Sequence, residues 1–82
     1  MTEIETKIIA IIAKELKLDD LPSLTDDLAK FEADSLDRAE IIFSIEDEFG
    51  ITLNIPDKAT AVKIFSTVQS VADYVSAQLN VK

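Results

Sequence analysis

The sequence predicts an all-α fold, a small four-helix bundle made of three main helices and one short helix. Its 82 residues include one glycine and two prolines, too few for a β-rich fold with many tight turns. Apolar residues recur instead at the three-and-four spacing that gathers them on one side of a helix. Because a chain of this length has room for one compact core, we expect a single domain over residues 1–82.

The first main helix is predicted over residues 3–18. Thr2 and Glu5 have the spacing of a capping box, in which each side chain bonds the other residue's backbone N–H. Beyond the helix, Pro22 prevents an easy continuation. One side of the helix is apolar and consists of Ile4, Ile8, Ile11, Ile12 and Leu16.

A connecting segment over residues 19–34 leads to the second main helix. Its apolar residues are spaced by three or four, which indicates a loop folded onto the core, with a short helical turn in part of it. The second helix is predicted over residues 35–49, because Asp34 and Ser35 both suit an N-cap and Gly50 suits a C-terminal stop. The apolar residues of the connection are Leu21, Leu24, Leu28 and Phe31.

The last third of the chain holds the short helix and the third main helix. Residues 51–53 resemble a strand fragment without an evident partner, and a short helix is predicted over residues 57–64 after Pro56. Ser66 and Gln69 again have capping-box spacing, so we expect the final helix to begin there and to end near residue 79. Its apolar side consists of Val68, Val71, Ala72, Val75 and Leu79.

Missing residue types exclude several kinds of chemistry. The chain has no Cys and no His, so disulfides, thiolate zinc sites and His-dependent nucleophilic catalysis are excluded. No segment has the alternating acids and central glycine of a calcium-binding loop. We therefore expect a protein that is not an enzyme and has no metal site.

The net charge of −8 and the pI near 4.2 restrict the partners. Nucleic acids and anionic membranes require a basic surface, so we expect neither, and we expect basic partner proteins instead. No stretch is long enough to insert into a membrane and no secretory signal is evident. These features predict a cytoplasmic protein, which we expect to be a monomer.

The negative charge is concentrated in one part of the sequence. Residues 19–48 contain eleven acidic and two basic residues, a net charge of −9, whereas the rest of the chain has five acidic and six basic residues. On the second helix the core side is assigned to Ile41, Ile42, Ile45 and Phe49. A second apolar strip, formed by Leu36, Ala39 and Phe43 and bordered by Asp37, Glu40 and Asp47, lies well away from that side. Such a strip is typical of a protein–protein site, unless the whole helix is buried.

Ser35 stands at the head of this acidic helix in the motif Asp34-Ser35-Leu36-Asp37. A serine at this place is commonly an N-cap, and this chain offers no base to activate it. Any chemistry at Ser35 must therefore be done by another enzyme. Taken alone, these residues also fit an unmodified acidic helical domain that binds a basic partner protein.

The motif, with Glu40 and the run Glu46-Asp47-Glu48-Phe49, resembles the acyl carrier proteins. Ile55-Pro56-Asp57 and Thr67-Val68-Gln69 are similar to later segments of that family, so the resemblance extends over nearly the whole chain. It implies an acyl-carrier-like helical bundle. It also implies a function in fatty-acid biosynthesis or in a specialised lipid or secondary-metabolite pathway.

The resemblance assigns roles to individual residues. It implies that a phosphopantetheinyl transferase attaches 4′-phosphopantetheine from coenzyme A to Ser35, and that the arm carries acyl groups as thioesters. It implies that acyl-transferring enzymes bind the second helix through basic patches, at Asp34, Leu36, Asp37, Glu40, Phe43 and Glu48. It also implies that the acyl chain is sheltered in the bundle, with Ile45, Ile55 and Ile64 as candidate lining residues.

Two features depart from the family pattern. Glu32 occupies a position, two residues before the aspartate, where the family usually has glycine. The stretch between Gly50 and Val68 is a few residues longer than usual. Both departures favour a carrier dedicated to a particular pathway over the housekeeping carrier of fatty-acid synthesis.

Overall fold

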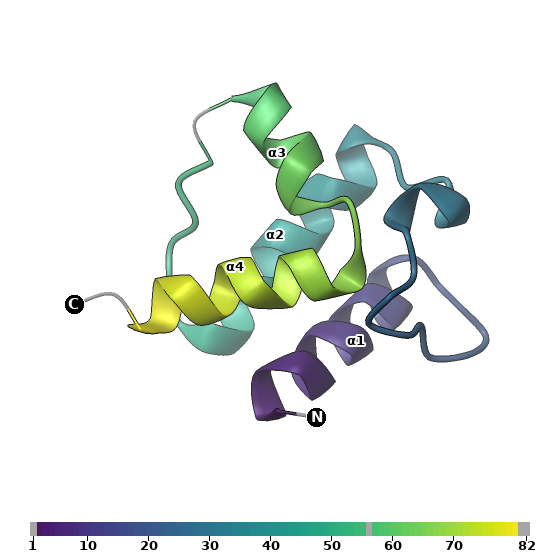
Figure 1. Ribbon diagram of the computed structural model, residues 1–82, viewed down its shortest axis with the longest axis horizontal. Coiled ribbons are helices and arrows are strands. Elements are labelled where there is room, and N and C mark those ends of the chain that lie inside the picture. The colour runs from purple at the N-terminus through teal and green to yellow at the C-terminus, as the bar shows by residue number, and fades with distance from the viewer. Residues whose placement is uncertain (1, 56, 81–82) are drawn as a thin grey trace.

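The computed structural model describes residues 2–55 and 57–80 and confirms the all-α fold (Figure 1). The elements in chain order are α1 (Glu3–Glu15), the 3₁₀ helix η1 (Leu28–Phe31), α2 (Ser35–Phe49), α3 (Lys58–Ile64) and α4 (Val68–Asn80). Among the described residues no strand forms, and residues 51–53 are extended without a partner. No helix of the described chain has the length and apolar character needed to cross a membrane.

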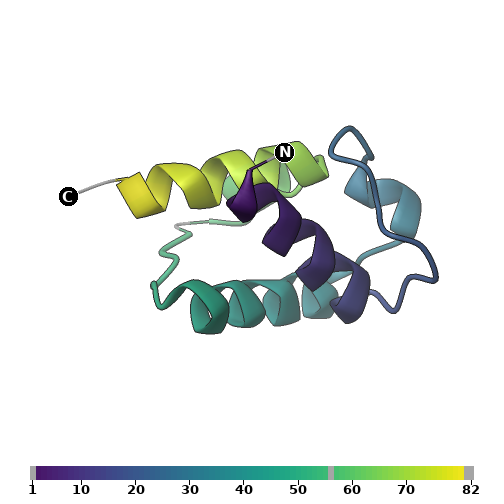
Figure 2. The same ribbon diagram turned by 90° about the horizontal axis from the view of Figure 1, so that it is seen from below.

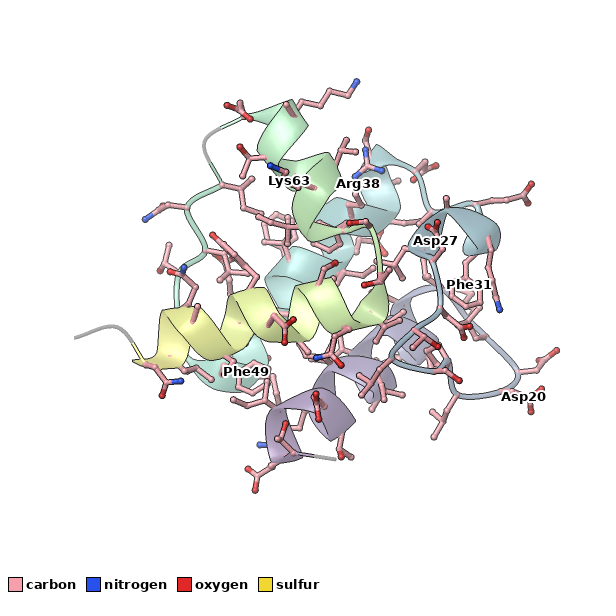
Figure 3. All side chains as sticks on the ribbon, in the orientation of Figure 1. Asp20, Asp27, Phe31, Arg38, Phe49 and Lys63 are labelled. Atoms are coloured by element: carbon pink, nitrogen blue, oxygen red, sulfur yellow. The ribbon has the colours of Figure 1, made fainter. Side chains whose placement is uncertain are left out.

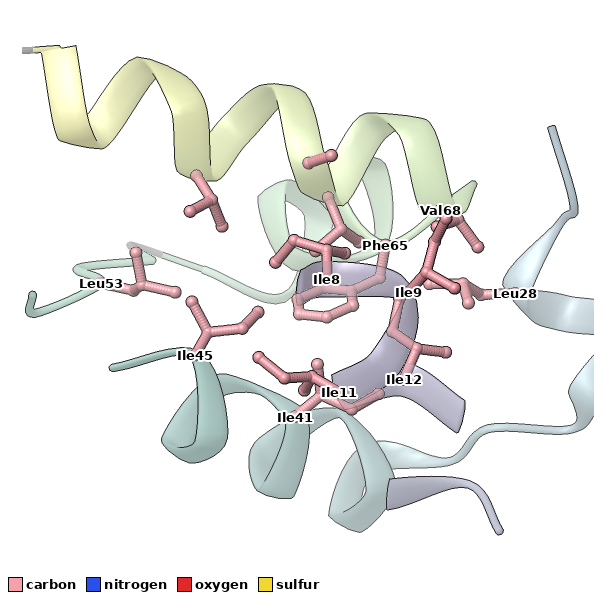
Figure 4. Packing of buried hydrophobic residues seen from close by; sticks show 13 residues of the cluster. Ile8, Ile9, Ile11, Ile12, Leu28, Ile41, Ile45, Leu53, Phe65 and Val68 are labelled. Atoms are coloured by element: carbon pink, nitrogen blue, oxygen red, sulfur yellow. The ribbon is translucent and has the colours of Figure 1, made fainter. Parts of the chain in front are cut away.

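Helix α1 packs against both α2 and α4, and α3 packs against α4 (Figure 2). The core lies where these contacts meet, with Ile8 and Ile12 of α1 facing Ile41 and Ile45 of α2 (Figure 4). All four side chains are fully buried. The predicted apolar sides of α1, α2 and α4 therefore all face this core.

Helix α1 is three residues shorter than predicted, because a Schellman motif ends it. Lys17 adopts a left-handed conformation with φ 55°. The Leu18 N–H then donates to the Ala13 carbonyl at 2.9 Å, and the Lys17 N–H donates to the Lys14 carbonyl. The Thr2–Glu5 capping box at the other end is present as predicted.

The predicted capping box of α4 is wrong by one residue. The Thr67 hydroxyl accepts from the Ser70 N–H and the Ser70 hydroxyl accepts from the Thr67 N–H, both at 3.0 Å. Gln69 instead extends across to α1, where its amide donates to Glu5 at 3.0 Å. At α3, Asp57 is the N-cap and the helix begins at Lys58, while the predicted role of Pro56 lies outside the described residues.

The long connection before α2 is folded onto the core as predicted. Leu28 is buried, and Leu24 and Phe31 pack against the core, whereas Leu21 remains largely exposed. Backbone hydrogen bonds between residues 24–28 and 66–69 attach this connection to the start of α4. The connection is therefore held in place just before the residues that start α2.

Candidate functional site

The acidic motif at the start of α2 builds the helix end. The Asp34 carboxylate accepts from the Asp37 N–H at 2.9 Å, and the Asp37 carboxylate accepts from the Asp34 N–H at 3.2 Å. Two aspartates thus form a reciprocal capping box, which satisfies backbone donors that the helix leaves without partners. Asp34 is the N-cap, and Ser35 is the first residue of the helix.

This arrangement rules out the capping interpretation of Ser35. The side chain is exposed, and within the described residues its hydrogen-bond partner is Arg38, whose guanidinium donates to the hydroxyl at 3.3 Å. Among residues 2–55 and 57–80, no carboxylate or other base accepts the hydroxyl proton. Ser35 therefore presents an accessible hydroxyl that this chain does not activate.

The residue before this turn is held in a conformation that suits glycine. Glu32 ends η1 with φ 57° and ψ 35°, and its N–H donates to the Ala29 carbonyl. A side chain in this left-handed region costs about 1–2 kcal/mol, so the backbone here explains why glycine would be favoured at this position. The structure keeps the turn despite the glutamate.

The outer face of α2 is largely exposed, which is one of the two alternatives that the residue spacing left open, although Asp37 and Ala39 are half-buried. We use this name for the strip of Leu36, Ala39 and Phe43 with its border of Asp37, Glu40 and Asp47. Leu36 is 66% exposed and Phe43 is 65% exposed, which excludes a helix buried on all sides. Glu40 and Asp47 are also exposed, so a partner would meet apolar side chains surrounded by carboxylates.

Glu48 does not belong to this face. Its carboxylate lies 3.4 Å from the Lys7 ammonium of α1, on the side where the two helices meet. This ion pair raises the pKa of Lys7 above its ordinary value, the hydrogen bond to Glu48 being the largest cause. Of the six predicted partner-binding residues, the structure thus groups five at the start and outer face of α2.

A cavity of about 240 Å³, which no local sequence pattern predicts, lies beside the start of α2. It is lined by η1 and the first turns of α2, which are neighbours in the chain, and by the last turn of α3, which is distant from both. Apolar atoms provide most of its surface. Its lining residues are Asp27, Leu28, Ala29, Ala33, Arg38, Ile41, Val62, Phe65 and Ser66.

The three predicted acyl-chain residues are not in this lining. Ile45 is fully buried in the core, and Ile55 and Ile64 are half-buried and pack against it. A second groove of about 280 Å³, between α1 and α2, does not include them either. Their proposed contact with an acyl chain stays a prediction.

Comparisons with known proteins agree with the geometry of this site. Residues 6–75 match the model of a protein family described as a phosphopantetheine attachment site. The chain is also 36% identical over 78 residues to a protein named acyl carrier protein 1, chloroplastic, from Casuarina glauca. The match covers 93% of this chain and 54% of that relative, so the chain spans about half of the relative's length. The chain belongs to the acyl carrier protein family, which is defined by a covalently attached 4′-phosphopantetheine.

Proposed function

We propose that this protein carries acyl intermediates on a 4′-phosphopantetheine arm attached to Ser35 and presents them to partner enzymes through the outer face of α2. The observation that carries the proposal is the division of roles at the start of α2. Asp34 and Asp37 cap the helix, so the exposed Ser35 hydroxyl is not needed for the fold. Helix capping and attachment of the arm therefore use different oxygen atoms.

The residues at the start of α2 fit this prosthetic group. A phosphodiester on Ser35 lies at the positive end of the helix dipole and beside the Arg38 guanidinium. In the attachment, the Ser35 oxygen bonds to phosphorus while the pyrophosphate bond of coenzyme A breaks and an adenosine bisphosphate leaves. The hydroxyl proton passes to a base of the transferase, because this chain supplies none. The bound arm provides a thiol that holds acyl groups as thioesters.

The outer face of α2 suits enzymes with a basic patch around an apolar depression. Leu36 and Phe43 supply apolar anchors, and the carboxylates of Glu40 and Asp47 attract a positively charged surface over several ångströms. Substituting Glu40→Lys is expected to raise the KM of a phosphopantetheinyl transferase for this protein several-fold at low salt. Asp20→Lys changes the net charge equally on the loop before η1 and is the matched control.

The proposal extends to the type of biosynthetic pathway that the carrier serves. Two features favour a dedicated lipid or secondary-metabolite pathway over general fatty-acid synthesis. They are Glu32 in a backbone conformation suited to glycine and the long stretch between Gly50 and Val68. A cytoplasmic location and the identity of the acyl-transferring enzymes stay predictions. A second function, an unmodified acidic domain that binds a basic partner, fits the same outer face.

Intact-mass spectrometry separates the two functions. We expect the wild-type protein, incubated with coenzyme A and a phosphopantetheinyl transferase, to gain the mass of one phosphopantetheine. Ser35→Ala should gain nothing. Ser23→Ala, which removes another exposed hydroxyl, should behave like the wild type. A wild-type chain without the added mass would favour the unmodified interaction domain.

A further inference from the structure

Arg38 is the basic residue in an otherwise acidic helix. Within the sequence of α2 it stands alone among five carboxylates and no lysine. Its guanidinium extends back one turn and donates to the Ser35 hydroxyl at 3.3 Å. The rest of this surface is negatively charged, whereas Arg38 places a positive charge beside Ser35. The position of this cation therefore needs an explanation.

The neighbouring carboxylates do not account for it. Asp34 and Asp37 lie within one turn of Arg38, but both accept hydrogen bonds from backbone N–H groups of the helix start. Within residues 2–55 and 57–80, the ion pairs involve Lys7 and Lys30 and none involves Arg38. The guanidinium therefore keeps most of its donors for another partner.

Arg38 also connects the serine to the cavity. The same side chain that bonds Ser35 is part of the cavity lining, together with Ala33, Val62 and Phe65. Figure 3 shows Arg38 at the N-terminal end of α2, beside α3. A group attached to Ser35 and bound by Arg38 is consequently held at the edge of this largely apolar cavity.

We infer that Arg38 is a positioning residue that binds the phosphate of the arm and fixes the root of the arm at the edge of the cavity. The inference rests on the proposed attachment at Ser35. A phosphodiester carries one negative charge, and a planar guanidinium can donate two parallel N–H groups to its oxygens. Without Arg38, only the positive end of the helix dipole would offset the repulsion of the new phosphate by the nearby Asp34 and Asp37.

Phosphorus NMR of the modified protein tests this role directly, because it observes the phosphodiester itself. The samples are wild type, Arg38→Lys, Arg38→Gln and, as the matched control, Lys63→Gln, which removes a cation of α3 outside the cavity lining. Each sample is first shown by mass to carry one arm. The reference is the chemical shift of the modified wild type unfolded in urea.

We expect the folded wild type and Lys63→Gln to share a ³¹P shift that differs clearly from the unfolded reference. The ³¹P shift of Arg38→Gln should lie close to that of the unfolded reference. The shift of Arg38→Lys should lie between those of the wild type and Arg38→Gln, because an ammonium restores the charge without the paired donors. Added NaCl should move the wild-type shift toward the reference and leave Arg38→Gln unchanged.

The outcomes distinguish this inference from the proposed function. Modified Arg38→Gln with the wild-type ³¹P shift contradicts the role of Arg38 and leaves the attachment at Ser35 intact. A wild-type protein that gains no arm mass contradicts the attachment at Ser35, and the role of Arg38 falls with it. If Lys63→Gln and Arg38→Gln changed the ³¹P shift equally, general surface charge would explain the shift. That result would also contradict the inference.

Discussion

On the inner side of α2, Ile41 and Ile45 are completely buried, whereas on the outer face Leu36 and Phe43 are 66% and 65% exposed. Both sets of residues are apolar and occupy the same helix. The inner side meets α1, and the outer face meets solvent and carries the carboxylates of Glu40 and Asp47. The difference shows how one helix can hold the fold together on one side and remain available to partners on the other.

The two sides should therefore respond differently to the same change. Truncations on the inner side cost stability, while truncations on the outer face cost partner recognition. Substitutions at the start of α2, where the two sides meet around Ser35, should have intermediate effects on stability.

The largest effect on stability is expected from truncating the inner side. Ile45→Ala should lower the free energy of unfolding by about 2–5 kcal/mol, because it leaves a cavity in the core. Phe43→Ala on the outer face should change it by no more than about 0.5 kcal/mol. Urea unfolding followed by circular dichroism measures both, and if Ile45→Ala does not fold, Ile45→Val should still cost about 1 kcal/mol. Equal costs at residues 43 and 45 would contradict the separation.

The helix cap should have the next largest effect. Asp34→Ala removes the side chain that accepts from the Asp37 N–H and should cost about 1 kcal/mol of unfolding free energy. Asp34→Asn removes the charge but keeps a capping oxygen, so it should lower the unfolding free energy by only a few tenths of a kcal/mol. Thermal unfolding of the two variants checks this order. If Asp34→Asn lost as much stability as Asp34→Ala, Asp34 would stabilise the protein through its charge and not through capping.

Relief of the turn before α2 should stabilise the protein. Glu32→Gly removes a left-handed glutamate, and the gain should be about 0.5–1 kcal/mol after allowance for the flexibility of glycine in the unfolded chain. Glu32→Ala removes the same charge but keeps the strain, so it should give little gain. If both variants gained equally, charge repulsion near Ser35 would be the cause instead.

The smallest effect is expected at low pH, and it originates away from the outer face. Glu5 accepts from the Thr2 N–H and from Gln69, and these bonds lower its pKa below the ordinary 4.5, the bond to the Thr2 backbone being the largest cause. A lowered pKa in the folded state gives stability that is present above pH 4.5 and is lost as the pH falls through the folded value. Glu5→Gln should weaken this loss between pH 5 and pH 2, measured by melting temperature.

Glu40→Gln is the matched control for this experiment. The Glu40 carboxylate forms no hydrogen bond or ion pair with residues in the described part of the chain. Its variant should therefore keep the acid profile of the wild type. A profile altered by Glu40→Gln and unaffected by Glu5→Gln would show that the outer face, and not the α1–α4 contact, sets the response to acid.

The positions of the main helices could be predicted from the sequence, because they depend on patterns of neighbouring residues. The apolar spacing of α1, α2 and α4 and the glycine stop at Gly50 depend only on nearby residues. The exposure of Leu36 and Phe43 depends on tertiary packing, and the residue spacing alone also allowed burial of the whole helix. The errors were also local, at positions where two residues are chemically alike. Thr67 and Ser66 both suit a cap, and nothing in the sequence reveals that Lys17 would take the left-handed conformation that ends α1.

The cavity and the role of Arg38 could not be predicted in this way. Ala33 lies just before α2 and Val62 and Phe65 lie at the end of α3, so only tertiary packing brings them to one cavity. In the sequence, the single arginine is one of two basic residues in an acidic segment. Its significance depends on the 3.3 Å contact with Ser35, which three-residue spacing permits but does not require.

Peptide mass mapping tests the central assignment most directly. Trypsin cleaves after Lys30 and Arg38, and the resulting peptide, residues 31–38, contains one side-chain hydroxyl, that of Ser35. After reaction with coenzyme A and a phosphopantetheinyl transferase, we expect the added phosphopantetheine mass on this peptide alone. The same mass on any other peptide, or on none, would contradict the assignment of Ser35 as the attachment site.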